Sequence, residues 1–169
     1  LFHTDIPEVF QRSVFEVMLT ADHHIYQVLT KRPSRAERFV RRNADLFVAG
    51  LVPAHIWMGT SVESQKVVHR IDQLRQVPAE MRFLSCEPLL GPLELVLDGI
   101  EWVIVGGESG PGARPLEREW VVGVRDQCKK AKVPFFFKQW GGAQKKKAGR
   151  ILDGRTYDEM PRDMGFAKA

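Results

Sequence analysis

The chain has 169 residues, of which 44% are hydrophobic and 27% are charged, and it carries a formal net charge of +4. This balance is ordinary for a soluble globular protein and leaves room for one domain with a real core. Because no transmembrane run or signal peptide is visible and only two distant cysteines are present, we expect a cytoplasmic protein without disulfides and without a membrane partner.

The sequence begins at Leu1 rather than at a methionine, so we expect that an upstream segment has been lost. Residues 3–19 have the spacing of an amphipathic helix. The apolar positions that would form its buried face are Ile6, Val9, Phe10, Val14, Val17 and Met18.

Five short apolar runs follow, at residues 26–29, 56–58, 81–84, 102–105 and 135–137. Each of them ends in a cluster of small or charged residues. Helical patterns occupy residues 34–42, 64–77 and 116–132, with a single helical turn expected at 93–97. Strands that alternate with amphipathic helices are typical of a parallel sheet.

The fourth run, Trp102 to Val105, has no polar residue and leads into Gly106, Gly107, Glu108, Ser109 and Gly110. An unbroken run of this kind predicts a strand that is buried on both faces. The two glycines allow a sharp turn or a close approach to a ligand. Glu108 would then lie at the carboxyl end of the strand, where α/β folds place their chemistry.

Neither a dinucleotide-binding glycine pattern nor a phosphate-binding loop motif is present, and polar residues follow every strand rather than one. We therefore expect a partial (β/α) barrel of mostly parallel strands over residues 1–142. Residues 143–169 would belong to the same domain as a basic loop (Lys145, Lys146, Lys147), a β-hairpin around Asp153-Gly154 and a tail.

The predicted cofactor-binding residues lie after three of the strands. Three carboxylates could surround the open end of the barrel, those of Glu63, Glu87 and Glu108. Gly106, Gly107 and Ser109 would lie beside them. The alternatives are a solvated loop acid for Glu108 and a position at a helix start for Glu63.

A second set of residues is predicted to bind substrate or an anion, and consists of Lys31, Arg32, Arg114, Lys138, Gln139 and Trp140. Trp140 could stack on a planar ligand or cover the end of the barrel. The helix at 34–42 also carries Arg35, Arg38, Arg41 and Arg42, a basic face that could touch phosphate or simply be solvated. Cys128 is expected in the core, and we predict no metal ligands in this chain.

Several long motifs give the chain its resemblance to a known family: DIP at 5–7, QVLTKRP at 27–33, FLSCEPLLGP at 83–92, WVIVGGESG at 102–110, ARP at 113–115 and FFFKQWG at 135–141. The chain resembles the phage Gp-thirty-seven/Gp-sixty-eight family, whose members are similar to radical S-adenosylmethionine barrels. The resemblance implies S-adenosylmethionine and an iron–sulfur cluster as cofactors. It also implies that the cysteine cluster which would hold the iron lies upstream of Leu1.

Two functions follow as expectations. The first is the barrel portion of a radical S-adenosylmethionine-like enzyme of phage type, which is inactive without the missing segment. The alternative is a phage-associated module that binds nucleic acid or another anion without catalysis, since basic residues are clustered with little aromatic interleaving. A barrel that lacks its first units would also expose strand edges, so we expect self-association.

Overall fold

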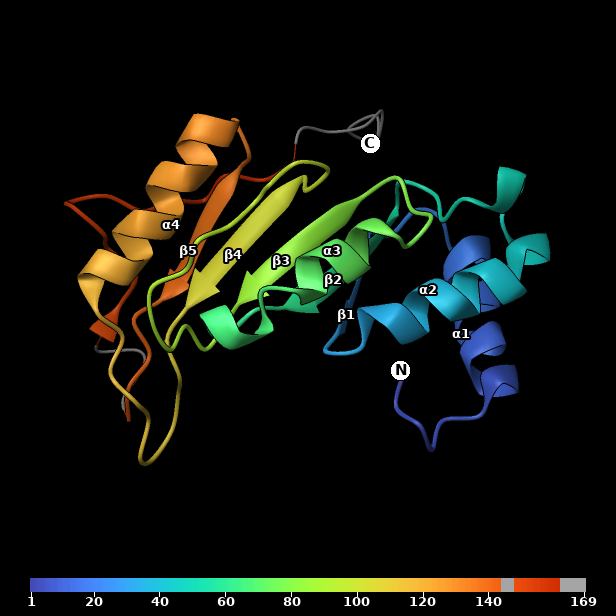
Figure 1. The fold of residues 1–169 in the computed structure, drawn as a ribbon, viewed down its shortest axis with the longest axis horizontal. Coiled ribbons are helices and arrows are strands. Elements are labelled where there is room, and N and C mark those ends of the chain that lie inside the picture. The colour runs from blue at the N-terminus through green and yellow to red at the C-terminus, as the bar shows by residue number, and fades with distance from the viewer. Residues whose placement is uncertain (144–147, 162–169) are drawn as a thin grey trace. The chain divides into compact units, whose positions relative to one another are not determined.

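A computed structural model of the protein describes residues 1–143 and 148–161. Its strands form a five-stranded parallel sheet in the order β1-β2-β3-β4-β5 (Figure 1). This order follows the sequence and has no switch point of the kind found in doubly wound sheets. Because strands in sequence order are the arrangement of a (β/α) barrel, the sheet is compatible with an arc of such a barrel. The predicted α/β class is confirmed.

The elements agree with the predicted runs to within a few residues, and one predicted helix is shorter than expected. The helices are α1 (Glu8–Thr20), α2 (Pro33–Arg42), α3 (Arg70–Arg75) and α4 (Arg118–Ala131), with 3-10 turns η1 (Ala44–Leu46), η2 (Val48–Gly50) and η3 (Gln65–Val67). The strands are β1 (Tyr26–Thr30), β2 (Ile56–Ser61), β3 (Arg82–Cys86), β4 (Trp102–Gly106) and β5 (Phe135–Gln139).

The chain divides into two compact units. Unit 1 consists of residues 1–61 and 69–83, and unit 2 consists of residues 62–68 and the chain from residue 84 onward. The predicted helix at 64–77 is therefore two pieces, of which η3 belongs to unit 2 and α3 to unit 1.

Unit 1 is built around four aromatic rings. Phe15 of α1 stacks on Phe39 of α2 with their ring centroids 5.1 Å apart. Phe2 packs against both of these rings, and Phe47 packs against Phe15. The buried residues of α1 are Gln11, Phe15 and Met18. The predicted face of this helix is correct at Met18 but wrong at Val9 and Phe10, which are 72% and 55% exposed. Because Phe15 packs against the aromatic rings of unit 1, the helix is oriented with Phe15 on its buried face.

In unit 2, every residue of β4 is buried, as the unbroken apolar run predicted. β4 pairs with β5 in parallel, Val103 opposite Phe135, and α4 lies beside β5 (Figure 1). The side of α4 that faces inward carries Val121, Val124 and Cys128, so the prediction that Cys128 belongs to the core is confirmed. The helical turn expected at 93–97 is absent, although Leu93 and Leu97 are buried.

The predicted hairpin is a tight turn closed by one antiparallel bridge between Leu152 and Arg155. Asp153 and Gly154 both have positive φ, which is the backbone conformation that this dipeptide favours. Residue Asp158 then bridges to Phe136 of β5. Lys145–Lys147 and most of the predicted tail lie outside the described residues.

No helix in the described part of the chain is long and apolar enough to span a lipid bilayer.

Candidate functional site

The carboxyl ends of three neighbouring strands bring polar side chains together in unit 2. Glu87 follows β3, Glu108 and Ser109 follow β4, and Lys138 and Gln139 end β5. Because parallel strands run in the same direction, these ends lie at one edge of the sheet (Figure 1).

Four of these side chains form a hydrogen-bonded group, which we call the Glu87 cluster (Glu87, Ser109, Lys138 and Gln139). The Lys138 ammonium donates to Oε2 of Glu87 at 2.9 Å, and the Gln139 amide donates to Oε1 of the same carboxylate at 3.3 Å. The amide of Gln139 also donates to the Ser109 hydroxyl at 2.7 Å. The side chain of Lys138 is 52% exposed and that of Glu87 22%, so solvent reaches the pair.

The glycines at the end of β4 and directly after it make room for this cluster. A Cβ atom at Gly106 would lie 3.2 Å from the carboxyl carbon of Glu87. At Gly107 an added Cβ would lie 1.9 Å from the Trp140 carbonyl oxygen, which leaves no space for a side chain. Gly141 has a φ of +82°, and an added Cβ there would lie 2.2 Å from the Glu108 carbonyl oxygen. The two backbones therefore continue side by side beyond the strands, and their glycines permit this contact.

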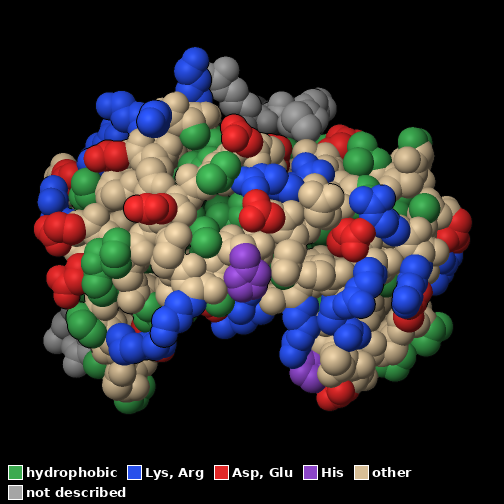
Figure 2. Space-filling view, in the orientation of Figure 1, with side chains coloured by type: hydrophobic (Ala, Val, Ile, Leu, Met, Phe, Trp, Pro, Cys, Tyr) green, Lys and Arg blue, Asp and Glu red, His purple; other side chains and the backbone are tan. Residues whose placement is uncertain are grey.

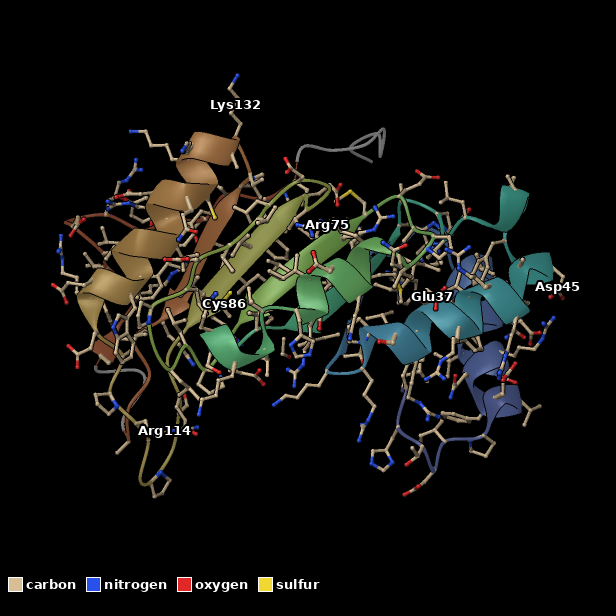
Figure 3. The ribbon with its side chains drawn as sticks, viewed as in Figure 1. Glu37, Asp45, Arg75, Cys86, Arg114 and Lys132 are labelled. Atoms are coloured by element: carbon tan, nitrogen blue, oxygen red, sulfur yellow. The ribbon has the colours of Figure 1, made fainter. Side chains whose placement is uncertain are left out.

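Glu108, the leading candidate, is held by Arg114 of the loop between β4 and α4. Its Oε2 accepts from the backbone N–H of Arg114 at 3.0 Å and from Nε at 2.8 Å, and its Oε1 accepts from Nη2 at 2.9 Å. These hydrogen bonds lower the pKa of Glu108 to about 2. Figure 3 shows Arg114 on this loop, near the carboxyl end of β4. The Glu108 carboxylate therefore binds Arg114, which the sequence predicted to bind substrate or an anion.

Glu63, the third predicted carboxylate, is only 9% exposed. Its carbonyl oxygen accepts a hydrogen bond from the Leu90 N–H at 2.9 Å, and the neighbouring Val62 N–H donates to the Ser85 carbonyl at 3.0 Å. Glu63 therefore ties the segment after β2 to the segment after β3 through its backbone.

The Trp140 side chain packs against and hydrogen-bonds to other residues of the chain. Its ring meets the ring of Phe137 edge-on with centroids 4.8 Å apart, and its indole N–H donates to the Ile151 carbonyl at 2.9 Å. These contacts match the alternative in which Trp140 covers the end of the sheet.

Lys31 and Arg32 belong to unit 1, whereas every other predicted site residue belongs to unit 2. Both side chains are exposed after β1, and the Arg32 N–H donates to the Thr30 hydroxyl at 3.0 Å. The two cations begin the segment that leads into α2.

The two cysteines of the sequence are unsuited to binding iron. Both Cys86 and Cys128 are buried. Burial, with smaller contributions from Cys128 and Glu63, raises the pKa of Cys86, and burial raises that of Cys128 to about 12. Among residues 1–143 and 148–161, no group of three potential ligands could hold a metal ion.

A pocket of about 680 Å³ at the start of β5 was not predicted from the sequence. Its walls include Phe135, Arg155, Tyr157 and Glu159, and the Arg155 guanidinium lies 4.2 Å from the centre of the Tyr157 ring. The nearby Arg155 and Arg125 lower the pKa of Tyr157. Arg155, Tyr157 and Glu159 are alternate positions of the sequence, and this spacing was the signal that could have indicated a shared face. Lys132, which also lines this pocket, and Arg114 lie at opposite ends of unit 2 (Figure 3).

A comparison with protein families finds a match over residues 1–161 to a family described as "Protein of unknown function (DUF5131)". The chain belongs to this family. No curated protein and no solved structure matches the chain. The family match covers unit 1, unit 2 as far as residue 161, and all of the candidate residues.

Proposed function

We propose that the Glu87 cluster binds the amino-acid part of S-adenosylmethionine in an enzyme similar to the radical S-adenosylmethionine barrels of the phage Gp-thirty-seven/Gp-sixty-eight family. The observation that supports this proposal is the solvent-accessible ion pair between Glu87 and Lys138. An amino acid carries an ammonium and a carboxylate on one carbon. It can offer the ammonium to Glu87 and the carboxylate to Lys138, so that each protein charge exchanges one partner for another.

The exchange is energetically accessible because the Lys138 side of the pair is 52% exposed, and ion pairs that solvent reaches contribute only about 0–1 kcal/mol to stability. Opening it costs little, whereas each charged hydrogen bond to a ligand is worth roughly 1.5–3 kcal/mol. The Ser109 hydroxyl and the Gln139 amide, 2.7 Å apart, are the neutral groups available to the rest of the ligand. The donor set of this edge therefore fits the polar part of S-adenosylmethionine.

The described residues do not fit the iron–sulfur cluster that the same resemblance implies. Such a cluster takes several thiolates held close together, whereas Cys86 and Cys128 are buried thiols with raised pKa values. The proposal therefore assigns to this chain only the binding of the organic ligand, and the ligands for iron would have to come from elsewhere.

Titration calorimetry with S-adenosylmethionine, methionine and adenosine tests the proposal. We expect the first two to bind, and Glu87→Gln or Lys138→Gln to weaken binding by about 10-fold or more. The matched controls Glu117→Gln and Lys130→Gln remove the same charges from exposed positions of unit 2 and should change affinity by less than about 2-fold. Equal affinities in all four variants would place the ligand elsewhere.

The alternative function, a module that binds nucleic acid or another anion without catalysis, is supported by the exposed cations Lys31 and Arg32. Binding of a duplex oligonucleotide that is lost in Lys31→Gln/Arg32→Gln, together with the absence of any S-adenosylmethionine binding, would favour this alternative.

A further inference from the structure

Unit 1 contains a second recess, which is lined in part by the basic face that the sequence predicted along residues 34–42. This recess, about 340 Å³ in volume, lies where the N-terminal segment and α1 meet α2. We call it the arginine groove. Its cationic wall consists of Arg35, Arg38 and Arg42, and Glu8 contributes the single carboxylate.

The three arginines face the same recess because of their spacing along α2. Positions three and four residues apart lie on one face of a helix, and 35, 38 and 42 follow that spacing. Figure 2 shows Lys and Arg side chains gathered over α2. The lining therefore has three positive charges against one negative charge, a net charge of +2.

These guanidinium groups are poorly neutralised by the described residues. Arg35 is half-buried and makes no ion pair there, and Arg38 reaches only the Ser34 carbonyl of its own helix, at 3.3 Å. Arg42 lies 3.6 Å from Glu8, a loose contact. By contrast, Arg41 on the same helix is paired closely with Glu37. The donors of Arg35 and Arg38 thus remain available to a ligand.

Hydrogen bonds fix the walls of the groove before any ligand arrives. The buried Asn43 amide donates to Oε1 of Glu8 at 3.0 Å and to the Phe39 carbonyl at 2.9 Å. The buried Gln11 amide donates to the Ile6 carbonyl at 3.1 Å, which holds the N-terminal segment against α1. Because the walls are ordered in advance, a ligand loses little affinity to ordering them.

We propose that the arginine groove binds the phosphate group of a small phosphorylated molecule. The planar fork of arginine matches the oxygens of phosphate, and converging forks favour a compact dianion over a single carboxylate. Ile6 and Phe39 also line the groove and offer an apolar wall to the carbon skeleton next to the phosphate. The volume is at the lower end for small-molecule sites, and Glu8 would repel a long polyanion, so the groove suits a small ligand better than a nucleic acid.

Ribose 5-phosphate, inorganic phosphate and ribose are the probes that test this proposal, with binding followed by calorimetry at low salt. We expect the two phosphates to bind and ribose to fail. Arg38→Gln should weaken phosphate binding by about 10-fold, and Arg35→Gln/Arg38→Gln should weaken it further. Arg41→Gln is the matched control, because it removes the same charge three residues away on the same helix but does not line the groove. It should change affinity by less than about 2-fold.

Three results would overturn the proposal. The first is the absence of phosphate binding to the wild-type chain at millimolar concentration, and the second is an equal loss in Arg38→Gln and Arg41→Gln, which would indicate general electrostatic attraction. The third is tight binding of a duplex oligonucleotide that phosphate cannot compete away. Arg38 is exposed, so a thermal melt of Arg38→Gln should match the wild type. Binding of S-adenosylmethionine should be unchanged in Arg38→Gln, which separates this site from the Glu87 cluster.

Discussion

Gly107 and Trp140 touch through their backbones beyond the ends of β4 and β5. The Gly107 N–H lies in this contact and donates to the Gln139 carbonyl at 2.9 Å, while a Cβ at Gly107 would lie 1.9 Å from the Trp140 carbonyl oxygen. The glycine therefore sets the separation of the two segments that carry Ser109 and Gln139. The geometry of the Glu87 cluster depends on this contact.

We expect Gly107→Ala to destabilise the protein by about 1–3 kcal/mol, because the backbone must move to admit the methyl group. Gly123→Ala on α4 is the matched control, since a Cβ there meets nothing within 4 Å. In a helix that change should stabilise by roughly 0.5–1 kcal/mol. Chemical denaturation measures both free energies of unfolding. Equal stability in the two variants would mean that the segments after β4 and β5 separate freely.

The ion pair between Glu108 and Arg114 predicts a dependence of stability on pH. Folding lowers the pKa of Glu108 from 4.5 to about 2, mainly through the hydrogen bonds from Arg114. The stabilisation is therefore complete above pH 4.5 and is lost as the pH falls towards 2. Melting temperatures of the wild type and Arg114→Gln should differ at pH 6 and converge at pH 2. Carboxyl NMR should show the pKa of Glu108 return towards 4.5 in Arg114→Gln, and an unchanged pKa would contradict the pairing.

The sequence located the strands because their apolar runs leave little choice of environment. The run from Trp102 to Val105 contains no polar residue, so both faces of this strand favour burial, and all four residues are buried. The polar ends of strands were also predictable, since parallel strands share a direction and their carboxyl ends share an edge. Glu87 and Lys138 were predicted as site residues on this basis alone, and Nζ of Lys138 lies 2.9 Å from Oε2 of Glu87.

The face of α1 could not be predicted in the same way. Its apolar residues form a stripe through Val9 and Phe10, but the helix buries Gln11 and Phe15 instead. The stacking of Phe15 on Phe39 selects this orientation, and that partner is 24 positions away in the sequence. The pairing of Arg114 with Glu108 could not be predicted either, because it depends on the path of the loop between β4 and α4. Contacts of this kind depend on tertiary structure rather than on local pattern.

Both cysteines should be unreactive in the folded protein. Burial raises the pKa values of Cys86 and Cys128, and the thiolate is the reactive form. With an aromatic disulfide reagent at pH 8, we expect release of little chromophore from the native chain and reaction of both thiols after denaturation. Rapid reaction of one thiol under native conditions would show that its side chain is accessible.

Anaerobic reconstitution with iron and sulfide should leave this chain without a four-iron cluster. The sequence offers two thiols, and a cluster of this type takes several that are held close together. Iron analysis after gel filtration should give much less than one cluster per chain, and the absorbance should lack the cluster's charge-transfer band. A stoichiometric cluster that survives gel filtration would show that other residues of this chain supply the ligands.

Strand β1 is the site at which we expect the chain to self-associate. It pairs in parallel with β2, and no described strand pairs with its other edge. Leu29, the fourth of the five residues of this edge strand, is 45% exposed. Strand edges of this kind pair with other chains unless a charge or a proline blocks them, and β1 contains neither.

Leu29→Lys should therefore reduce self-association, because a lysine on an edge strand hinders pairing with a second copy. Val48→Lys is the matched control, since Val48 is 92% exposed and lies in η2, outside the sheet. Sedimentation velocity at matched concentrations should show association of the wild type and of Val48→Lys but a largely monomeric Leu29→Lys. If the wild type remains a monomer at all concentrations, the free edge of β1 is not an association site. If both variants dissociate equally, the added charge acts through general repulsion rather than through β1.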